Sequence, residues 1–214
     1  MTPYSRLIEA LPTKPKTWLI TGVAGFIGSN LLEHLLQLNQ RVVGLDNFST
    51  GFKENLDFIK THPQKNRFTF IEGDIRSDKT CLEACSHVDF VLHQAALGSV
   101  PRSVENPLLY HDNNITGTLN MLSAAKKQGV KRFVFASSSS VYGDTPTLPK
   151  IETMTPTPKS PYAISKITGE YYCKNFSDLY QLSTIALRYF NVFGPKQNPS
   201  SQYAAVIPKF IVAG

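Results

Sequence analysis

The chain has 214 residues and a formal net charge of +6, and 42% of its residues are hydrophobic, which is the composition of a globular domain and excludes extensive disorder. Apolar runs such as 18–20 and 88–92 are far shorter than the roughly 20 residues that a membrane span needs. The basic residues are scattered, with only the pairs Lys126–Lys127 and Lys131–Arg132 adjacent, so we expect neither a membrane nor a nucleic-acid partner.

The N-terminal residues and the cysteines indicate the cellular compartment of the protein. Residues 1–16 contain no continuous apolar stretch followed by a small-residue cleavage site, which argues against a secretory signal. Cys81, Cys85 and Cys173 cannot all pair, and no Cys/His cluster has zinc-ligand spacing. We therefore predict structural thiols, no bound metal and a cytoplasmic location.

Short apolar runs rich in β-branched and aromatic residues recur along the chain and predict strands. Between them lie segments with apolar residues at helical spacing, such as 26–36 and 119–125. Strands that alternate with helices predict an α/β fold with a doubly wound, parallel sheet of the Rossmann type. The predicted strands are 17–21, 41–45, 67–71, 88–93, 132–136 and 183–189.

The alternation of strands and helices also predicts the domain organisation. It begins at Thr17 and stops after Arg188, beyond which the residues are typical of a loop and the start of one more helix. We expect an N-terminal extension at 1–16 and a dinucleotide-binding domain with the catalytic residues at 17–190. Residues 191–214 are expected to begin a further domain.

Three glycines follow the first predicted strand and open the first predicted helix, at Gly22, Gly25 and Gly28. Because glycine has no Cβ, the backbone there can approach a pyrophosphate, which binds the free N–H groups at a helix N-terminus. The GxxGxxG spacing is one residue wider in its first gap than the GxGxxG fingerprint, and such glycines can also serve the turn alone. We predict that this turn, including Phe26 and Ile27, binds a dinucleotide.

An acidic residue, Asp46, closes the second predicted strand 18 residues after Gly28. A carboxylate at this place can accept both ribose hydroxyls of an adenosine, which favours NAD over NADP, whose 2′-phosphate it would repel. The alternative is that Asp46 only stabilises the turn after the strand. Asp74, at the end of the third strand, is a candidate contact for the adenine amine. The other residues predicted to bind the cofactor at these strand ends are Asn47, Ser49, Thr50, Gly51, Ile75, Gln94, Ala95 and Ala96.

Tyr162 and Lys166 are four residues apart, so in a helix both project from one face. A tyrosine with a pKa near 10 is a poor base at neutral pH, but a nearby ammonium and a nicotinamide cation both favour the phenolate. Tyr162 is then a candidate proton acceptor for a sugar hydroxyl. Taken alone, the spacing also fits an ordinary pair on a helix surface.

Four serines, Ser137–Ser140, directly follow the fifth predicted strand at the same edge of the sheet as the glycine turn. Their hydroxyls can hydrogen-bond a substrate oxygen and share its proton with Tyr162, although a serine run can also be a loop or a helix cap. The glycine turn, the strand-end acid, the serines and the Tyr–Lys pair occur in the order that brings them to one crevice, and this conjunction predicts an active site.

Seven segments spread over the whole chain carry a family resemblance. They are TGVAGFIGSNLLE, LDNFSTG, GDIR, HQAALGSVPRS, SSSSVYGD, SPYAISK and LRYFNVFGP. They resemble the extended short-chain dehydrogenases/reductases, and among these most of all the UDP-N-acetylglucosamine 4-epimerases. Members of that family are longer, so the resemblance implies that most of a small C-terminal substrate domain is missing here. It also implies a homodimer that buries helices around 103–128 and 160–180.

The resemblance further assigns roles to individual residues. It implies that Tyr162 is the base, that Lys166 holds the nicotinamide ribose and lowers the pKa of Tyr162, and that Ser138 bonds the sugar 4-hydroxyl. Tyr189 and Asn114 match positions near the cofactor. The other residues that match substrate-contacting positions are Gly98, Ser99, Arg102, Ser139, Ser140, Asn191, Ala205 and Val206.

The reaction that the resemblance implies is NAD-dependent 4-epimerisation of UDP-N-acetylglucosamine and UDP-N-acetylgalactosamine through a transient 4-keto sugar. A 4,6-dehydratase would need an Asp–Glu pair where this chain has Ser139 and Ser140. Two alternatives are left open. The sugar epimerised at carbon 4 could be UDP-glucuronate or UDP-glucose, or the chain could be an NAD-binding module without activity.

Overall fold

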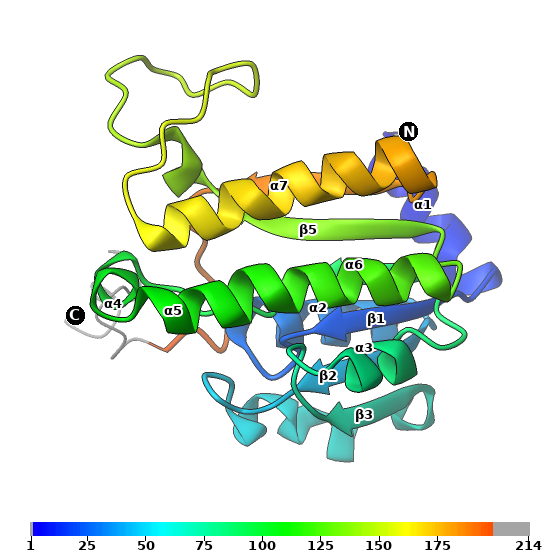
Figure 1. Ribbon diagram of the computed structural model, residues 1–214. Helices are drawn as coiled ribbons and strands as arrows, with labels where there is room; N and C mark the ends of the chain where they lie inside the picture. The colour runs from blue at the N-terminus through cyan, green and yellow to red at the C-terminus, as the bar shows by residue number, and fades with distance from the viewer. Residues whose placement is uncertain (1, 199–214) are drawn as a thin grey trace, which may run out of the picture.

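The computed structural model describes residues 2–198, in which six parallel strands form a single sheet of order β3-β2-β1-β4-β5-β6 (Figure 1). All neighbouring strands pair in parallel. The predicted class, an α/β fold with a doubly wound sheet, is therefore confirmed. The strands are β1 Thr17–Thr21, β2 Arg41–Asp46, β3 Phe68–Glu72, β4 Phe90–His93, β5 Arg132–Ser138 and β6 Thr184–Tyr189.

Helices cover both faces of the sheet. In Figure 1, α3 (Asp78–Ala84), α6 (Gly117–Lys127) and α7 (Pro161–Tyr180) lie in front of the strands, and α2 (Phe26–Gln37) lies behind them. None of the helices within residues 2–198 is both long enough and apolar enough to cross a membrane. The shorter elements are α1 (Pro3–Ala10), α4 (Val100–Glu105), α5 (Pro107–Tyr110), the 3₁₀ turns η1 (Leu11–Thr13), η2 (Lys53–Lys60), η3 (Lys65–Arg67) and η5 (Ser139–Tyr142), and the π-helical turn η4 (His111–Thr116).

Two apolar clusters, one on each face of the sheet, lie between the strands and the helices. Neighbouring residues of β1 point to opposite faces, and both Leu19 and Ile20 are 0% exposed because each belongs to a different cluster. Leu19 packs with residues of α3, α6 and α7, whereas Ile20 packs with residues of α2. Ile185 and Leu187 of β6 remain 40% and 42% exposed, so the described residues leave one face of the outer strand uncovered.

The cysteines belong to this core. Cys81, Cys85 and Cys173 are free and buried, and burial raises the pKa of each thiol to about 12. A thiol with so high a pKa is not a reactive thiolate at neutral pH. The prediction of structural thiols is confirmed.

The order of the strands decides where a ligand can bind. From β1 the chain moves to β2 and β3 on one side, and then returns to β4, β5 and β6 on the other. The loops after β1 and β4 therefore diverge and leave a crevice at the carboxyl ends of the strands, which is where ligands bind in open α/β sheets.

Candidate active site

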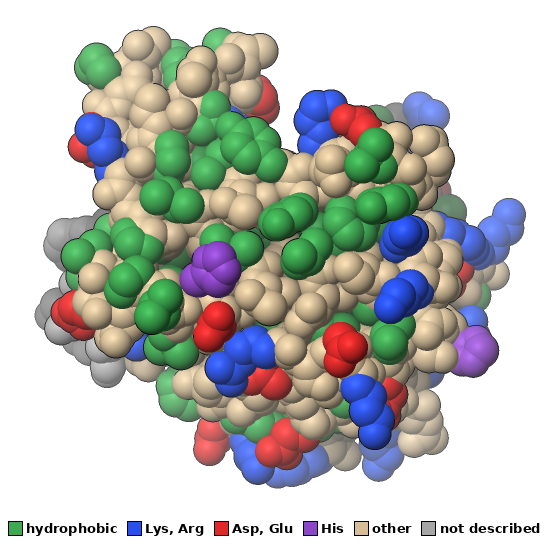
Figure 2. Space-filling model, viewed as in Figure 1, with side chains coloured by type: hydrophobic (Ala, Val, Ile, Leu, Met, Phe, Trp, Pro, Cys, Tyr) green, Lys and Arg blue, Asp and Glu red, His purple; other side chains and the backbone are tan. Residues whose placement is uncertain are grey.

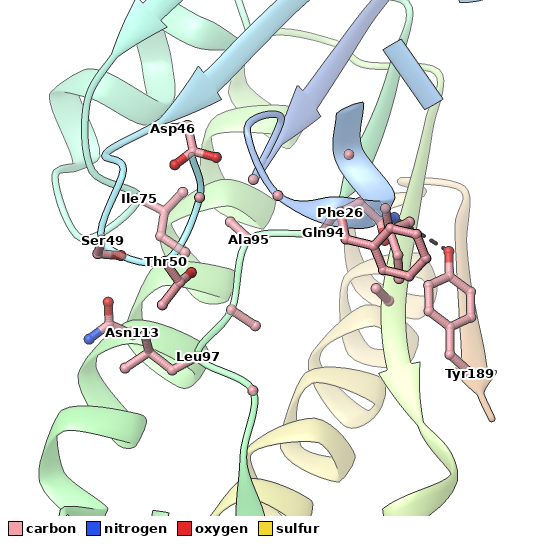
Figure 3. Close-up of a pocket in the computed structure, with 18 of the residues that line it drawn as sticks. Phe26, Asp46, Ser49, Thr50, Ile75, Gln94, Ala95, Leu97, Asn113 and Tyr189 are labelled. Carbon is pink, nitrogen blue, oxygen red and sulfur yellow. Dashed lines mark hydrogen bonds between the residues drawn. The ribbon is translucent and has the colours of Figure 1, made fainter. Parts of the chain in front are cut away.

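A cavity of about 490 Å³ lies at this switch point, which is within the usual size of a small-molecule site. Figure 3 shows Asp46, Ser49 and Thr50 on one side of it, and Gln94 and Tyr189 on the other. It is lined by Gly22, Gly25, Phe26, Ile27, Gly28, Leu45, Asp46, Asn47, Ser49, Thr50, Gly51, Gly73, Ile75, Gln94, Ala95, Ala96, Leu97, Gly98, Asn113, Ala136, Ser137, Ser138, Tyr162, Lys166, Tyr189, Phe190 and Val192.

The glycine turn is packed so closely that side chains would not fit. Gly22 has a φ of +69°, and a Cβ on it would lie 2.9 Å from the backbone nitrogen of Ala95. A Cβ on Gly28 would overlap the carbonyl oxygen of Gly22. Gly25 is the N-cap of α2 and offers no capping side chain, so the first N–H groups of α2 face the cavity free of a side-chain acceptor. These features fit the pyrophosphate of a dinucleotide.

Asp46 is held rigidly at the end of β2. Its Oδ2 accepts a hydrogen bond from Ala24 N at 2.9 Å, and its Oδ1 accepts one from Phe48 N at 2.8 Å. The contact with Phe48 means that Asp46 also serves the turn. Since each carboxylate oxygen has two lone pairs, both oxygens can still accept from a ribose diol. The two interpretations of Asp46 are therefore compatible.

Asp74 is bound to protein groups beside the cavity rather than being one of its lining residues. Its Oδ2 lies 2.7 Å from Arg76 Nη2 and accepts from Asn47 Nδ2 at 2.9 Å. The hydrogen bonds from Arg76 lower the pKa of Asp74 to about 2. Asp74 thus orients Asn47 at the cavity wall, and its contact with adenine stays a prediction.

The loop after β4 is fixed by Asn114 on η4. Its side chain pairs with both backbone groups of Leu97, at 2.8 and 3.0 Å, and donates to Ser165 Oγ on α7 at 3.0 Å. Ser99, in the same loop, caps α4 with a φ of +131°, a conformation that costs strain for a residue with a Cβ. The cavity wall after β4 is therefore locked against the helix that carries Tyr162.

The start of α7 places Tyr162 at the edge of β5. Ser160 is the N-cap and accepts from Ala163 N at 3.1 Å, Pro161 occupies the first turn, and Tyr162 N donates to Ser103 Oγ at 3.1 Å. One turn later, the ammonium of Lys166 donates to the carbonyl oxygen of Ala136 at 2.8 Å and lies 5.8 Å from the centre of the Tyr162 ring. The predicted pair thus shares one face of the helix, at the cavity.

The electrostatics of this pair differ from the expectation based on the lysine alone. Burial raises the pKa of Tyr162, and a hydrogen bond with the Ser138 side chain only partly opposes it. Burial also lowers the pKa of Lys166 to about 8. At Tyr162, desolvation therefore outweighs the stabilisation of a phenolate by a neighbouring ammonium.

The four serines do not act as one group. β5 extends through Ser138, so Ser137 and Ser138 alternate in direction like other strand residues. Both line the cavity, but the Ser137 hydroxyl donates to a carboxylate oxygen of Glu170. Ser139 and Ser140 lie in η5, and Ser140 Oγ is buried without a hydrogen-bond partner within the described residues.

The cavity brings together most of the cofactor residues predicted from sequence, together with Gly98, Ser138, Tyr162 and Lys166. Arg102 lines an adjoining cavity of about 300 Å³ that shares Gly98 with the first. Asn191 is exposed and is not a lining residue, and the predictions for Ala205 and Val206 lie outside the described residues.

Some lining residues were missed by the sequence argument. Asn113, which lies in no quoted motif, reaches the cavity from the π-helical turn. Phe190 and Val192 lie in the quoted segment LRYFNVFGP, but no role was predicted for them, and they reach the cavity from the chain after β6. Leu45, Gly73 and Ala136 directly neighbour predicted residues at strand ends, which is a signal that could have found them.

A sheet of this order with a glycine-lined cavity at its switch point defines a Rossmann-type dinucleotide-binding protein, and the Tyr162–Lys166 pair narrows the class to the short-chain dehydrogenases/reductases. Buried Gln94 Oε1, which has no partner within residues 2–198, adds an acceptor for a ligand at this site. The chain belongs to the NAD dependent epimerase/dehydratase family, whose model matches residues 18–213. The predicted cofactor, NAD, is thereby confirmed at the level of the family.

Similar proteins act on several sugars. The chain is 40% identical to the UDP-glucose 4-epimerase of Mycolicibacterium smegmatis, over 92% of this chain and 63% of that protein. It is 40% identical to the UDP-glucuronate 4-epimerase of Thermodesulfobacterium geofontis, over 85% and 58%. A solved structure of UDP-N-acetylglucosamine 4-epimerase from Methanobrevibacter ruminantium M1, in complex with UDP-N-acetylmuramic acid, matches with a TM-score of 0.86 and 44% identity, over 94% and 63%. The chain thus spans about three fifths of the length of these relatives.

Proposed function

We propose that the protein containing this chain catalyses the 4-epimerisation of a UDP-sugar, with NAD as the recycled cofactor. The observation that carries the proposal is the placement of Ser138, Tyr162 and Lys166 around one cavity that also contains the glycine turn and Asp46. The names of the similar proteins support the same reaction type.

The residues of the chain divide the chemistry between them. Bound NAD would supply the reversible acceptance of a hydride from carbon 4 of the sugar. Tyr162 takes the proton of the 4-hydroxyl and later returns it to the 4-keto sugar, while Ser138 hydrogen-bonds the same oxygen. Lys166 holds the nicotinamide ribose and places a positive charge beside the phenol. The glycine turn binds the pyrophosphate, and Asp46 binds the adenosine ribose.

For the sugar we propose an N-acetylhexosamine. The structural match to the Methanobrevibacter enzyme and the segment with Gly98, Ser99 and Arg102 support this choice. UDP-glucose and UDP-glucuronate are the alternatives, because relatives at 40% identity carry those names. Dehydration is disfavoured because Ser139 and Ser140 stand where an acid–base pair is needed.

The proposal extends to the organisation of the protein. We propose that 17–190 form the NAD-binding domain, that 1–16 extend it, and that 191–214 begin the substrate-binding domain. We also propose a cytoplasmic location, which the three buried free thiols support.

A homodimer is part of the same proposal. Figure 2 shows apolar side chains gathered over α4, α5 and α7 on the face towards the viewer. Patches of this kind on a soluble protein mark interfaces, and a second copy can bury the same patch by two-fold symmetry. The exposed apolar residues of this helix face, as we define it, are Val100, Val104, Leu108, Leu109, Ile164, Tyr171, Leu179 and Tyr180.

The test is an NMR assay of the chain in its complete, longer form with NAD and UDP-N-acetylglucosamine, UDP-glucose or UDP-glucuronate. We expect the 4-epimer of the acetylated sugar to accumulate fastest. Tyr162→Phe should lower kcat by about 100-fold or more while NAD stays bound, because only the proton acceptor is lost. Absence of any epimer, with NAD retained, would contradict the proposal and leave an NAD-binding module.

A further inference from the structure

Helix α7 presents three polar side chains to the carboxyl end of β5. Tyr162, Lys166 and Glu170 are spaced by one helical turn each, and therefore share one face of the helix. Tyr162 hydrogen-bonds Ser138, Lys166 donates to the Ala136 carbonyl, and Glu170 accepts from Ser137. Only the first two have a part in the proposed chemistry.

The carboxylate of Glu170 is held by Arg188 from the neighbouring strand. Arg188 Nε donates to Oε1 at 2.9 Å, and Nη2 donates to Oε2 at 2.8 Å, which is a bidentate arrangement. The two side chains are only 13% and 16% exposed. Arg188 is the register partner of Ser137, and its guanidinium lies 4.7 Å from the centre of the Tyr142 ring. The pair therefore contacts Ser137, which is the residue directly before Ser138 on β5.

If Glu170 had no cationic partner, its carboxylate would compete with the Ala136 carbonyl for the ammonium of Lys166. Residues four apart on a helix bring their side chains within reach of each other, so a Lys–Glu pair at this spacing attracts. Lys166 is 4% exposed, and water cannot screen that attraction. The bidentate contact with Arg188 satisfies Glu170 instead, and the ammonium of Lys166 remains on the Ala136 carbonyl, at the cavity.

We propose that Arg188 is a positioning residue, which neutralises Glu170 so that the ammonium of Lys166 stays directed at the cofactor and at Tyr162. The catalytic consequence rests on the proposed function, but the electrostatic arrangement can be measured without turnover. A pair that served only to join β6 to α7 would have no charge-specific effect on Lys166.

Other titratable groups also surround the Tyr162–Lys166 pair, and none is changed in the test. His93 on β4 is buried between Thr21 and Thr118, and desolvation lowers its pKa to about 3, so it is neutral at working pH. Its electrostatic effect on Lys166 is therefore small. The remaining titratable groups on the packed elements are Tyr110 on α5, Tyr142 on η5, Arg102 and Glu105 on α4, His111 and Asp112 on η4, Lys126 and Lys127 on α6, Arg132 on β5, and Tyr189 on β6.

The direct test is an NMR titration of Lys166 in the 214-residue chain. The chain is labelled with ¹³C-lysine, and the Lys166 signal is assigned as the one missing in Lys166→Arg. Burial lowers the pKa of Lys166 to about 8, which is within the measurable range. In Arg188→Gln the unpaired Glu170 should raise this pKa by about one pH unit or more, and in Glu170→Gln the unpaired Arg188 should lower it by a similar amount. In the double variant, the pKa of Lys166 should be close to its value in the unchanged chain.

The control is an ion pair on the same helix that is far from Lys166. Lys174 and Asp178 also lie four residues apart, with Nζ and Oδ2 2.7 Å apart, but both are exposed. Asp178→Asn should leave the Lys166 titration unchanged. The proposal would be overturned if the pKa of Lys166 did not shift, or if it shifted in the same direction in both single variants. A shift in the same direction would indicate loosened packing, which admits water whichever charge is removed. If Arg188→Gln does not fold, Glu170→Gln decides alone: a lowered pKa supports the proposal, and an unchanged or raised one overturns it.

The complete enzyme provides a second readout. Arg188→Gln should lower kcat by about tenfold with little change in KM, and adding Glu170→Gln should restore most of the loss. A double variant as impaired as Arg188→Gln would indicate a structural role and overturn the proposal. If the unchanged enzyme turned over no UDP-sugar, the proposed function would fail, while the lysine titration would still decide the inference.

Discussion

At the scale of single residues, Asp46 shows how the end of a strand can present a fixed hydrogen-bond acceptor to the cavity. Its carboxylate is fixed by two backbone N–H groups, from Ala24 and Phe48, before any ligand arrives. A fixed acceptor loses little conformational entropy on binding, which favours affinity for a ribose. Sequence alone offered either a ribose acceptor or a turn residue, and the geometry allows one side chain to be both.

We predict that Asp46→Ala weakens NAD binding by about 10- to 100-fold, because the ribose hydroxyls lose a charged acceptor. Isothermal titration calorimetry with the 214-residue chain measures this change directly. Asp57→Ala is the control, since Asp57 is exposed in η2, where it pairs with Lys60, and does not line the cavity. If the unsubstituted chain and the Asp46→Ala variant bound NAD with equal affinity, the proposed ribose contact of Asp46 would be refuted.

At the scale of elements, Gln40 connects the N-terminal extension to the sheet. The residue is 0% exposed, and its Oε1 accepts from Lys16 N at 2.9 Å and from Trp18 Nε1 at 3.1 Å. Its Nε2 donates to Leu11 O at 2.8 Å and to Leu38 O at 2.7 Å. One buried amide thus satisfies groups from η1, β1 and the end of α2.

We predict that Gln40→Ala lowers the free energy of unfolding by about 3 kcal/mol, because it leaves several buried polar groups unpaired. The measurement is urea denaturation followed by circular dichroism. Gln37→Ala, at an exposed position three residues earlier, should change stability by less than about 0.5 kcal/mol. Similar losses in both variants would show that the hydrogen bonds of Gln40 contribute nothing specific.

The sequence predicted these elements well because each has a local cause. All six predicted strands are present, and the first, Thr17–Thr21, has the predicted bounds. Short apolar runs bury both faces of a strand wherever the sheet places them, so their position can be recognised without the fold. The serine run was less predictable, because whether β5 ends before Ser137 or after Ser138 depends on pairing with β6.

At the scale of the whole molecule, the helix face over α4, α5 and α7 is the surface that we assign to a second copy. Tyr171 lies on it and is 62% exposed, while Tyr4 on α1 is 64% exposed and does not belong to it. The two tyrosines are therefore a matched pair for testing the interface.

We predict that the protein sediments as a dimer and that Tyr171→Glu converts it to a monomer, because a charge would be buried at the interface. For the 214-residue chain the mass would fall from twice 23.8 kDa to 23.8 kDa in analytical ultracentrifugation. Tyr4→Glu should leave the dimer intact. A monomer before any substitution, or a dimer that survives Tyr171→Glu, would count against this surface.

The sequence by itself determined the class of fold, the order of its elements and the glycine turn between β1 and α2, because strand and helix periodicity and glycine spacing are local properties of the chain. Tertiary structure alone decided how these residues act. It directed Ser137 to Glu170 and Asp74 to Arg76, and it buried Tyr162 so that desolvation dominates its pKa. It also placed Arg188 of β6 against Glu170 of α7, eighteen residues apart in the chain. Such contacts depend on which strands become neighbours, and desolvation depends on everything packed around a group, so neither can be derived from the spacing of residues along the chain.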